Sequence, residues 1–303
     1  MAVCTGYLAP RYLRENLHHE LRSLGGYAEA HDRLFLAPGA PRRVFWVQNL
    51  WLDPVRIPFD SISDAARKLR GLQRNWAPYL YQLHRRGALI QEQLPPLPLR
   101  PRRFPLELPE APMGGWTLLD EHTLLASPRC SSPLPSGEIR FEENHADPPS
   151  RAYLKLWELF TLLGRAPRPG EVCLDFGASP GSWTWVLHSL GARVTSVDRA
   201  PLEGRIAALP GVRHIRHNAF SLRPAELGRV DWLFSDVVAY PDRLWSWLEL
   251  WLGAGTCSRF VCTVKFQGPP ERPMIERFAS VPGSRLMHLC HNRHELTWVL
   301  LRD

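Results

Sequence analysis

Three lysines stand out in a chain that otherwise takes its positive charge from arginine. Of the 37 lysines and arginines among 303 residues, only Lys68, Lys155 and Lys265 are lysines. Arginine stays protonated under all ordinary conditions, whereas the pKa of a lysine can fall far enough for it to give up a proton. We interpret Lys68 as an ordinary surface residue because it lies in a polar, helical stretch. Lys155 and Lys265 are the candidates for chemistry that needs a proton acceptor.

A second candidate for a functional role is the loop Leu174 to Trp183. It reads LDFGASPGSW, and it is expected to follow a buried strand and to open a helix. Gly177 and Gly181 are expected to let the backbone approach a ligand at the carboxyl end of that strand. The loop is not a phosphate-binding P-loop, because no Lys-Ser/Thr follows the glycines. It is not a dinucleotide-binding loop either, because it has no Gly-x-Gly-x-x-Gly. Asp198, which ends the next strand, suits hydrogen bonding to ribose hydroxyls. A tight turn that binds no ligand remains the alternative.

Residues 149–303 predict the scaffold that brings such groups together. Strands are expected at 171–176, 193–197, 230–235 and 260–264, and helices at 151–163, 183–190 and 241–252. Alternating strands and helices predict a mostly parallel sheet with helices on both faces. The segments 285–289 and 296–301 are joined by a short turn, so the last strand is expected to be antiparallel. The fold class is therefore α/β, with a Rossmann-like sheet.

The preceding part of the chain predicts a smaller α+β domain at 1–94. Its expected elements are helices at 12–24 and 60–72, the latter capped by Asp60 or Ser61, and a strand at 44–52. Seven prolines follow between Pro95 and Pro112, beside Arg100, Arg102 and Arg103. They predict an extended, positively charged connector at 95–148, with short strands at 116–119 and 138–141.

Five motifs of the C-terminal part resemble, in order, those of the FtsJ-like RNA 2′-O-methyltransferases. The loop Leu174 to Trp183 resembles motif I of that family. The remaining four are Ser150-Arg-Ala-Tyr-Leu-Lys155, Asp231-Trp-Leu-Phe-Ser-Asp236, Val264-Lys265 and Glu295-Leu-Thr-Trp298. The resemblance covers about 149–303 and implies a Rossmann-like methyltransferase domain with a catalytic tetrad. The tetrad residues are Lys155, Asp236, Lys265 and Glu295.

The resemblance also implies S-adenosylmethionine as the cofactor and RNA, first of all ribosomal RNA, as the partner. The implied cofactor-binding residues are Asp175, Gly177, Ala178, Ser179, Pro180, Gly181, Ser182, Trp183, Asp198, Asn218 and Asp236. Two of them depart from the family pattern, because Ser182 replaces a glycine and Asn218 an acid expected near the adenine. In the family member that these motifs resemble most, a THUMP-type RNA-binding domain precedes the catalytic domain, so the resemblance implies that residues 1–94 are a degenerate, THUMP-like domain.

The four tetrad residues suit methyl transfer to a ribose. A 2′-hydroxyl is a poor nucleophile, which must be held in line with the methyl group and lose its proton; positioning alone lowers a barrier by about 7–11 kcal/mol at best. We expect Lys265 to accept the proton or orient the hydroxyl, and Lys155 to supply a perturbing charge and hold the hydroxyl. Asp236 would orient Lys265 and lie near the sulfonium, and Glu295 would fix Lys155 or the ribose.

Composition agrees with an RNA partner and argues against several other classes of protein. The net charge of +7 and the pI of about 9.3 favour a polyanion. The six scattered cysteines include no Cys-x-x-Cys pair, which argues against a zinc site or a disulfide framework. The chain has no apolar run long enough for a membrane span and no visible secretory signal. We therefore expect a cytoplasmic protein that needs no metal, with His291 and His294 as polar turn or RNA-facing residues.

Three other functions remain open from the sequence. A non-catalytic RNA-binding protein could retain the fold, and the departures at Ser182 and Asn218 motivate that alternative. A methyltransferase that acts on the 2′-hydroxyl of tRNA would need the same tetrad. A small-molecule methyltransferase would not need two lysines in one site, so the loss or retention of activity without Lys265 separates it from the other functions.

Overall fold

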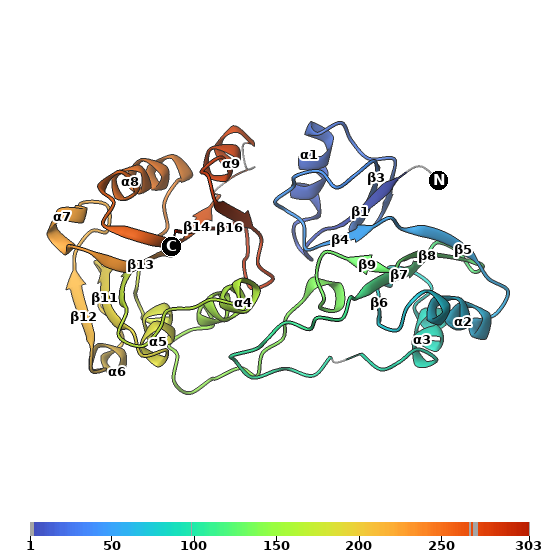
Figure 1. Cartoon of the computed structure of the whole chain (residues 1–303), viewed down its shortest axis with the longest axis horizontal. Helices are drawn as coiled ribbons and strands as arrows, with labels where there is room; N and C mark the ends of the chain where they lie inside the picture. Colours follow the sequence, from blue (N-terminus) through green and yellow to red (C-terminus); the bar gives the residue numbers. More distant parts are fainter. Residues whose placement is uncertain (1–2, 98, 267, 269–271, 303) are drawn as a thin grey trace. The chain divides into compact units, whose positions relative to one another are not determined.

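The computed structural model describes residues 3–97, 99–266, 268 and 272–302, and it divides into two compact units, Met1–Phe141 and Glu142–Asp303 (Figure 1). The division differs from the expected boundaries at 94 and 148. Strands β7 (Gly114–Leu118) and β8 (Thr123–Ser127) lie within the proposed connector, yet they pair with each other and are the central strands of one sheet of the first unit. Residues 95–141 are thus part of the N-terminal unit.

The N-terminal unit contains two sheets. The first has the order β2-β3-β1-β4-β9, and the second has the order β5-β8-β7-β6. The remaining strands are β1 (Cys4–Leu8), β2 (Glu29–His31), β3 (Leu34–Pro38), β4 (Asn49–Leu52), β5 (Val55–Pro58), β6 (Trp76–Pro78) and β9 (Arg129–Cys130). The helices are α1 (Arg14–Ser23), α2 (Ile62–Leu72), α3 (His84–Glu92) and the 3₁₀ turn η1 (Pro135–Gly137). The unit is therefore α+β, as predicted; its THUMP-like character stays a prediction.

Local hydrogen bonds explain where this unit differs from the expected elements. The strand expected at 44–52 is confined to β4, because the Glu20 carboxylate accepts the backbone N–H groups of Phe45 and Trp46 that a neighbouring strand would have paired. The strand expected at 138–141 is reduced to one bridge, between Arg102 and Phe141. Helix α2 forms as predicted, with Ser61 as its N-cap.

The C-terminal unit is a seven-stranded Rossmann-like sheet with the order β12-β11-β10-β13-β14-β16-β15. The strands are β10 (Val172–Phe176), β11 (Arg193–Asp198), β12 (Val212–Arg216), β13 (Val230–Ser235), β14 (Cys257–Lys265), β15 (Ser284–Met287) and β16 (Glu295–Leu301). Strands β10 to β14 run parallel, and β16 is antiparallel to both of its neighbours. The predicted fold class is confirmed, including the antiparallel last strand.

Helices cover both faces of this sheet (Figure 1). Helices α4 (Tyr153–Leu163), α5 (Ser182–Ser189) and α6 (Gly204–Ala207) lie on one side, and α7 (Pro224–Leu227), α8 (Pro241–Ala254) and α9 (Arg272–Ala279) on the other. The core between sheet and helices is rich in aromatic rings, with Phe176 packed edge-on against Trp247 and Trp251. Among the described residues, no helix is both long and apolar enough to cross a membrane.

Candidate active site

The four tetrad residues lie together at the carboxyl end of the parallel strands. Lys265 is the last residue of β14, and its Cα lies opposite that of Glu295, the first residue of the antiparallel β16. Asp236 directly follows β13, the other neighbour of β14, and its N–H donates to the main-chain oxygen of Phe176 at the end of β10. Lys155 comes from α4, which packs on α5. Strand ends and one helix thus place the tetrad.

The tetrad side chains form one continuous chain of contacts. Lys155 Nζ lies 2.5 Å from Glu295 Oε1 and 3.4 Å from both carboxylate oxygens of Asp236. Lys265 Nζ lies 2.9 Å from Asp236 Oδ1 and donates a 2.6 Å hydrogen bond to the main-chain oxygen of Asp236. The four side chains are between 9% and 19% exposed, so each is shielded but reachable. The structure thus brings together all four residues that the sequence predicted.

The carboxylates hold Lys155 in its charged form. Burial alone would lower the pKa of Lys155, but Asp236 and Glu295 outweigh it and raise that pKa above its ordinary value. Lys155 therefore remains an ammonium ion, as expected for the residue that supplies charge rather than accepts a proton. Glu295 contacts Lys155, which was one of its two expected partners; its contact with the ribose stays a prediction.

The motif I loop has a backbone conformation that requires glycine at two positions. The reason seen in the structure is close packing against other parts of the chain. Gly177 and Gly181 have φ angles of 78° and 117°, which side chains rarely adopt. A Cβ on Gly177 would lie 2.8 Å from the backbone nitrogen of Val237, and one on Gly181 would lie 2.8 Å from Ile206. The glycines therefore allow the loop to pack against neighbouring protein segments. Their expected approach to a ligand stays a prediction.

Two residues beside this loop retain capacity to bind a ligand. The Asp198 carboxylate ends β11 and accepts one backbone N–H on each oxygen, from Ser179 and from Ala200. Each oxygen keeps a second lone pair, and the side chain is half-buried, so hydrogen bonds to ribose hydroxyls remain available. Asn218 is also half-buried and uses its Oδ1 to accept the N–H of Phe220. Both positions fit a nucleoside-containing cofactor.

The polar side-chain atoms of Ser182 and Trp183 form hydrogen bonds with other residues of the chain. Ser182 Oγ accepts the N–H of Ser150 at 2.9 Å and lies 2.8 Å from its hydroxyl. Trp183 Nε1 donates to the main-chain oxygen of Ala152 at 3.0 Å. Ser182 is thus the anchor for the segment that leads into α4 and Lys155. The departure from the family's glycine therefore has a structural explanation.

Asp175 has an unmet hydrogen-bonding requirement next to the loop. Its Oδ2 accepts the hydroxyl of Thr184 at 2.6 Å, whereas its buried Oδ1 has no hydrogen-bond partner among the described residues. Burial raises the pKa of Asp175 to about 7; the hydrogen bonds from Thr184 lower this pKa, and the nearby Asp236 and Asp198 carboxylates raise it. A buried acceptor without a partner is characteristic of a site that a ligand or a proton completes.

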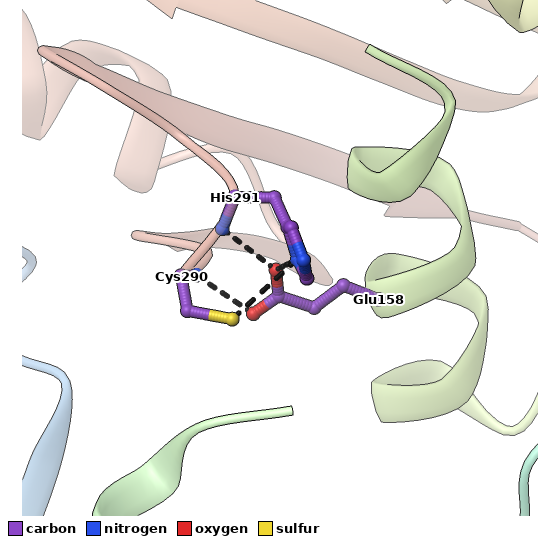
Figure 2. Close-up of side chains that lie close together, drawn as sticks. All are labelled: Glu158, Cys290 and His291. Atoms are coloured by element: carbon purple, nitrogen blue, oxygen red, sulfur yellow. Dashed lines mark hydrogen bonds and ion pairs between the residues drawn. The ribbon is translucent and has the colours of Figure 1, made fainter. Parts of the chain in front are cut away.

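A further cluster, which the sequence did not predict as a unit, lies beside the tetrad. Glu158 on α4 meets Cys290 and His291 in the segment between β15 and β16 (Figure 2). Its carboxylate accepts the N–H of Cys290 at 2.7 Å and that of His291 at 3.0 Å, and lies 2.6 Å from His291 Nδ1. One signal could have revealed it: Glu158 is a lone acid in an apolar helix, one turn after Lys155.

Comparison with known proteins places the chain in a family. A model described as FtsJ-like methyltransferase matches residues 148–291. A protein of Xylella fastidiosa (strain M12) is 32% identical over 297 residues, which make up 93% of this chain and 78% of that protein. With its Rossmann-like sheet and assembled tetrad, the chain belongs to the FtsJ-like methyltransferase family.

Two curated relatives share one name. The Xylella protein and one from Alkalilimnicola ehrlichii are both named ribosomal RNA large subunit methyltransferase M. The second is 37% identical over 215 residues, which make up 66% of this chain but only 59% of that relative. Among solved structures, a Burkholderia thailandensis 1,6-didemethyltoxoflavin-N1-methyltransferase matches with a TM-score of 0.36 and 22% identity, covering 50% of this chain and 76% of that chain.

Proposed function

We propose that this chain transfers a methyl group from S-adenosylmethionine to a ribose 2′-hydroxyl of large-subunit ribosomal RNA. The observation that carries the proposal is the contact of both Lys155 and Lys265 with Asp236, because a chain with three lysines places two of them on one carboxylate. The names of the curated relatives support ribosomal RNA as the substrate. The reaction belongs in the cytoplasm, where the six free cysteines of the described chain stay reduced.

The residues divide the work of methyl transfer among them. When bound, the cofactor supplies an electrophilic methyl group on a sulfonium. Lys155, held cationic by Glu295 and Asp236, donates a hydrogen bond that fixes the ribose hydroxyl. Lys265 takes the proton from that hydroxyl, and Asp236 orients its amine through the carboxylate and the main-chain oxygen.

The residues around motif I would hold the cofactor. Asp198 would accept hydrogen bonds from the ribose hydroxyls of the cofactor on its remaining lone pairs, and Asn218 would hydrogen-bond the adenine. The backbone of Gly177 to Gly181 forms the turn between β10 and α5, at the carboxyl end of the parallel strands where such ligands bind. The proposal assigns no step to a metal, because the cofactor would supply the methyl group and Lys265 would accept the proton.

The N-terminal unit would contact RNA through a basic cavity. A cavity of about 430 Å³ lies wholly within this unit and is lined by apolar side chains, including Leu106 and Met113, with arginines among them. Arg100, Arg102 and Arg140 in its lining are exposed. Apolar walls beside arginines suit a single-stranded base with its phosphates.

A methyl-transfer assay tests this proposal. Bulk RNA from cells that lack the protein is incubated with the purified chain and tritiated S-adenosylmethionine, and ribosomal RNA and tRNA are then separated. We expect label on large-subunit ribosomal RNA in an alkali-resistant dinucleotide, which is the signature of 2′-O-methylation. Label on tRNA alone would support the tRNA-directed alternative, and no label together with no cofactor binding would support the non-catalytic one.

A further inference from the structure

We propose that Glu158 is a positioning residue of the active site, which fixes the segment 290–295 and so holds Glu295 against Lys155. The proposal rests on the proposed function, because it assigns a role within the same site. Glu158 contacts no tetrad residue in the described hydrogen bonds and ion pairs, so it acts through the main chain of the segment that ends in Glu295.

The carboxylate of Glu158 is buried and committed to this segment. Glu158 is 3% exposed, and a charge at such a position is tolerated only when it is hydrogen-bonded. Oε1 accepts the Cys290 N–H and Oε2 accepts the His291 N–H, so one carboxylate grips two consecutive amides (Figure 2). Hydrogen bonds to an ionised acceptor are about twice as strong as neutral ones. The grip is therefore strong enough to determine where the segment lies.

Helix α4 holds the segment at two points. Lys155 and Glu158 are three residues apart and so lie on the same side of α4. Glu158 holds residues 290 and 291, and Lys155 contacts Glu295 at 2.5 Å. Between these points, Asn292 Nδ2 donates to the main-chain oxygen of Glu295 at 3.3 Å and to Thr297 Oγ1 at 3.1 Å. A displacement at residue 290 would thus be passed on to Glu295.

The same three side chains could be considered as a metal site, but their geometry favours the hydrogen-bonded arrangement. Their ligand atoms lie within 4.8 Å of one another. The distance from His291 Nδ1 to Glu158 Oε2 is 2.6 Å, which is a hydrogen-bond length. Two such ligands of one tetrahedral zinc ion, each about 2.0–2.1 Å from the metal, would lie roughly 3.3 Å apart.

The chain offers a matched control for this role. Glu20 on α1 is 7% exposed and its carboxylate also accepts two consecutive backbone N–H groups, those of Phe45 and Trp46. Glu20 belongs to the N-terminal unit, whereas the tetrad lies in the C-terminal unit. Glu20→Gln therefore disturbs an equivalent hydrogen-bonding arrangement without touching the segment that ends in Glu295.

The scarcity of lysine provides a direct readout. Lysine-selective ¹³C and ¹⁵N labelling yields side-chain signals from three residues only, which Lys155→Arg and Lys265→Arg assign. We expect Glu158→Gln to move the Lys155 signal toward its position in Glu295→Gln, while the Lys68 signal stays in place and Glu20→Gln moves none. The experiment needs neither RNA nor methyl donor, so its outcome is independent of the proposed methyl transfer.

A double-mutant cycle gives the second measurement. Glu158→Gln should reduce single-turnover methyl transfer about tenfold in the wild-type background and by less than twofold in the Glu295→Gln background, because residues that act through one another are non-additive. Glu158→Asp, which keeps the charge but is too short to reach both amides, replaces Glu158→Gln if that variant does not fold. An unchanged Lys155 signal in either folded variant overturns the proposal, as does one zinc ion bound tightly by the wild type and lost in Glu158→Gln.

Discussion

Lys265 contacts Asp236 twice, since its Nζ lies 2.9 Å from Oδ1 and donates a 2.6 Å hydrogen bond to the main-chain oxygen. The second contact fixes the amine relative to the backbone at the end of β13, so rotation of the Asp236 side chain does not release it. Lys155 lies 3.4 Å from the same carboxylate. Both amines therefore meet on one carboxylate, and the proposed function assigns the charge to Lys155 and the acceptance of the proton to Lys265.

Replacing Lys265 should abolish methyl transfer while sparing cofactor binding. We expect Lys265→Ala and Lys265→Arg to slow single-turnover methylation by about 10²–10⁴-fold, because neither side chain can accept a proton at neutral pH. The dissociation constant of S-adenosylmethionine, measured by calorimetry, should stay within about threefold. Lys68→Ala is the matched control, since Lys68 pairs only with Asp64 on the surface of α2 and the main chain of Pro58 in the described contacts. Full activity in Lys265→Ala would instead favour a small-molecule methyltransferase.

The buried carboxyl of Asp175 should make stability fall as pH rises. Its pKa is raised from 3.8 to about 7 by burial, so between these values the folded state holds a proton that the unfolded state has lost. The wild type should therefore lose stability relative to Asp175→Asn between about pH 4 and 7, by at most about 4 kcal/mol, with no further change above pH 7. Urea denaturation of both proteins at a series of pH values measures the difference. A difference that is flat with pH would contradict a neutral Asp175.

Restoring the family's glycine at position 182 should weaken the protein. Ser182→Gly removes the hydrogen bonds that anchor Ser150, so we expect a loss of about 1–3 kcal/mol in the free energy of unfolding. Turnover should fall several-fold because the start of α4 loosens, whereas cofactor affinity should not improve by more than about threefold. Tighter cofactor binding by an order of magnitude would show that the serine hinders the cofactor instead.

The exposed arginines of the basic cavity should contribute to RNA affinity. We expect the double variant Arg100→Glu and Arg102→Glu to bind substrate RNA at least tenfold more weakly at 0.1 M salt. The slope of log affinity against log salt should become shallower by about 1–2, one for each lost phosphate contact. Cofactor affinity serves as the control. RNA binding with the wild-type strength and slope would exclude this cavity from the RNA interface.

The C-terminal fold was predictable because its signals are local. Strand β13 has the predicted bounds at Val230 and Ser235, since its apolar residues end at a polar residue there. Trp247 and Trp251 lie four residues apart on α8 and are both buried in the core, as expected for one face of an amphipathic helix. Helix α9 was not predicted, and the N-terminal strands were assigned poorly. Phe45 and Trp46 read as strand residues, but the distant Glu20 carboxylate takes their N–H groups.

The tetrad was predictable for a different reason than its surroundings. Lys155, Asp236, Lys265 and Glu295 lie in recognisable motifs, and the register of β14 against β16 then places two of them opposite each other. Glu158 and Ser182 act through hydrogen bonds to main-chain atoms of segments far away in the chain. Almost any residue type can supply a main-chain N–H group or oxygen, so the sequence does not reveal which residues are the partners. These two roles could therefore be found only from the structure.

The central claim is that the lysine pair deprotonates a ribose hydroxyl. The most direct measurement is mass spectrometry of nucleosides from large-subunit ribosomal RNA, taken from cells that lack the protein and treated with the purified chain and S-adenosylmethionine. The account predicts one new 2′-O-methylated nucleoside with the wild type and with Lys68→Ala, and none with Lys265→Arg. A methyl group on a base, or the same 2′-O-methylated product with Lys265→Arg, would contradict it.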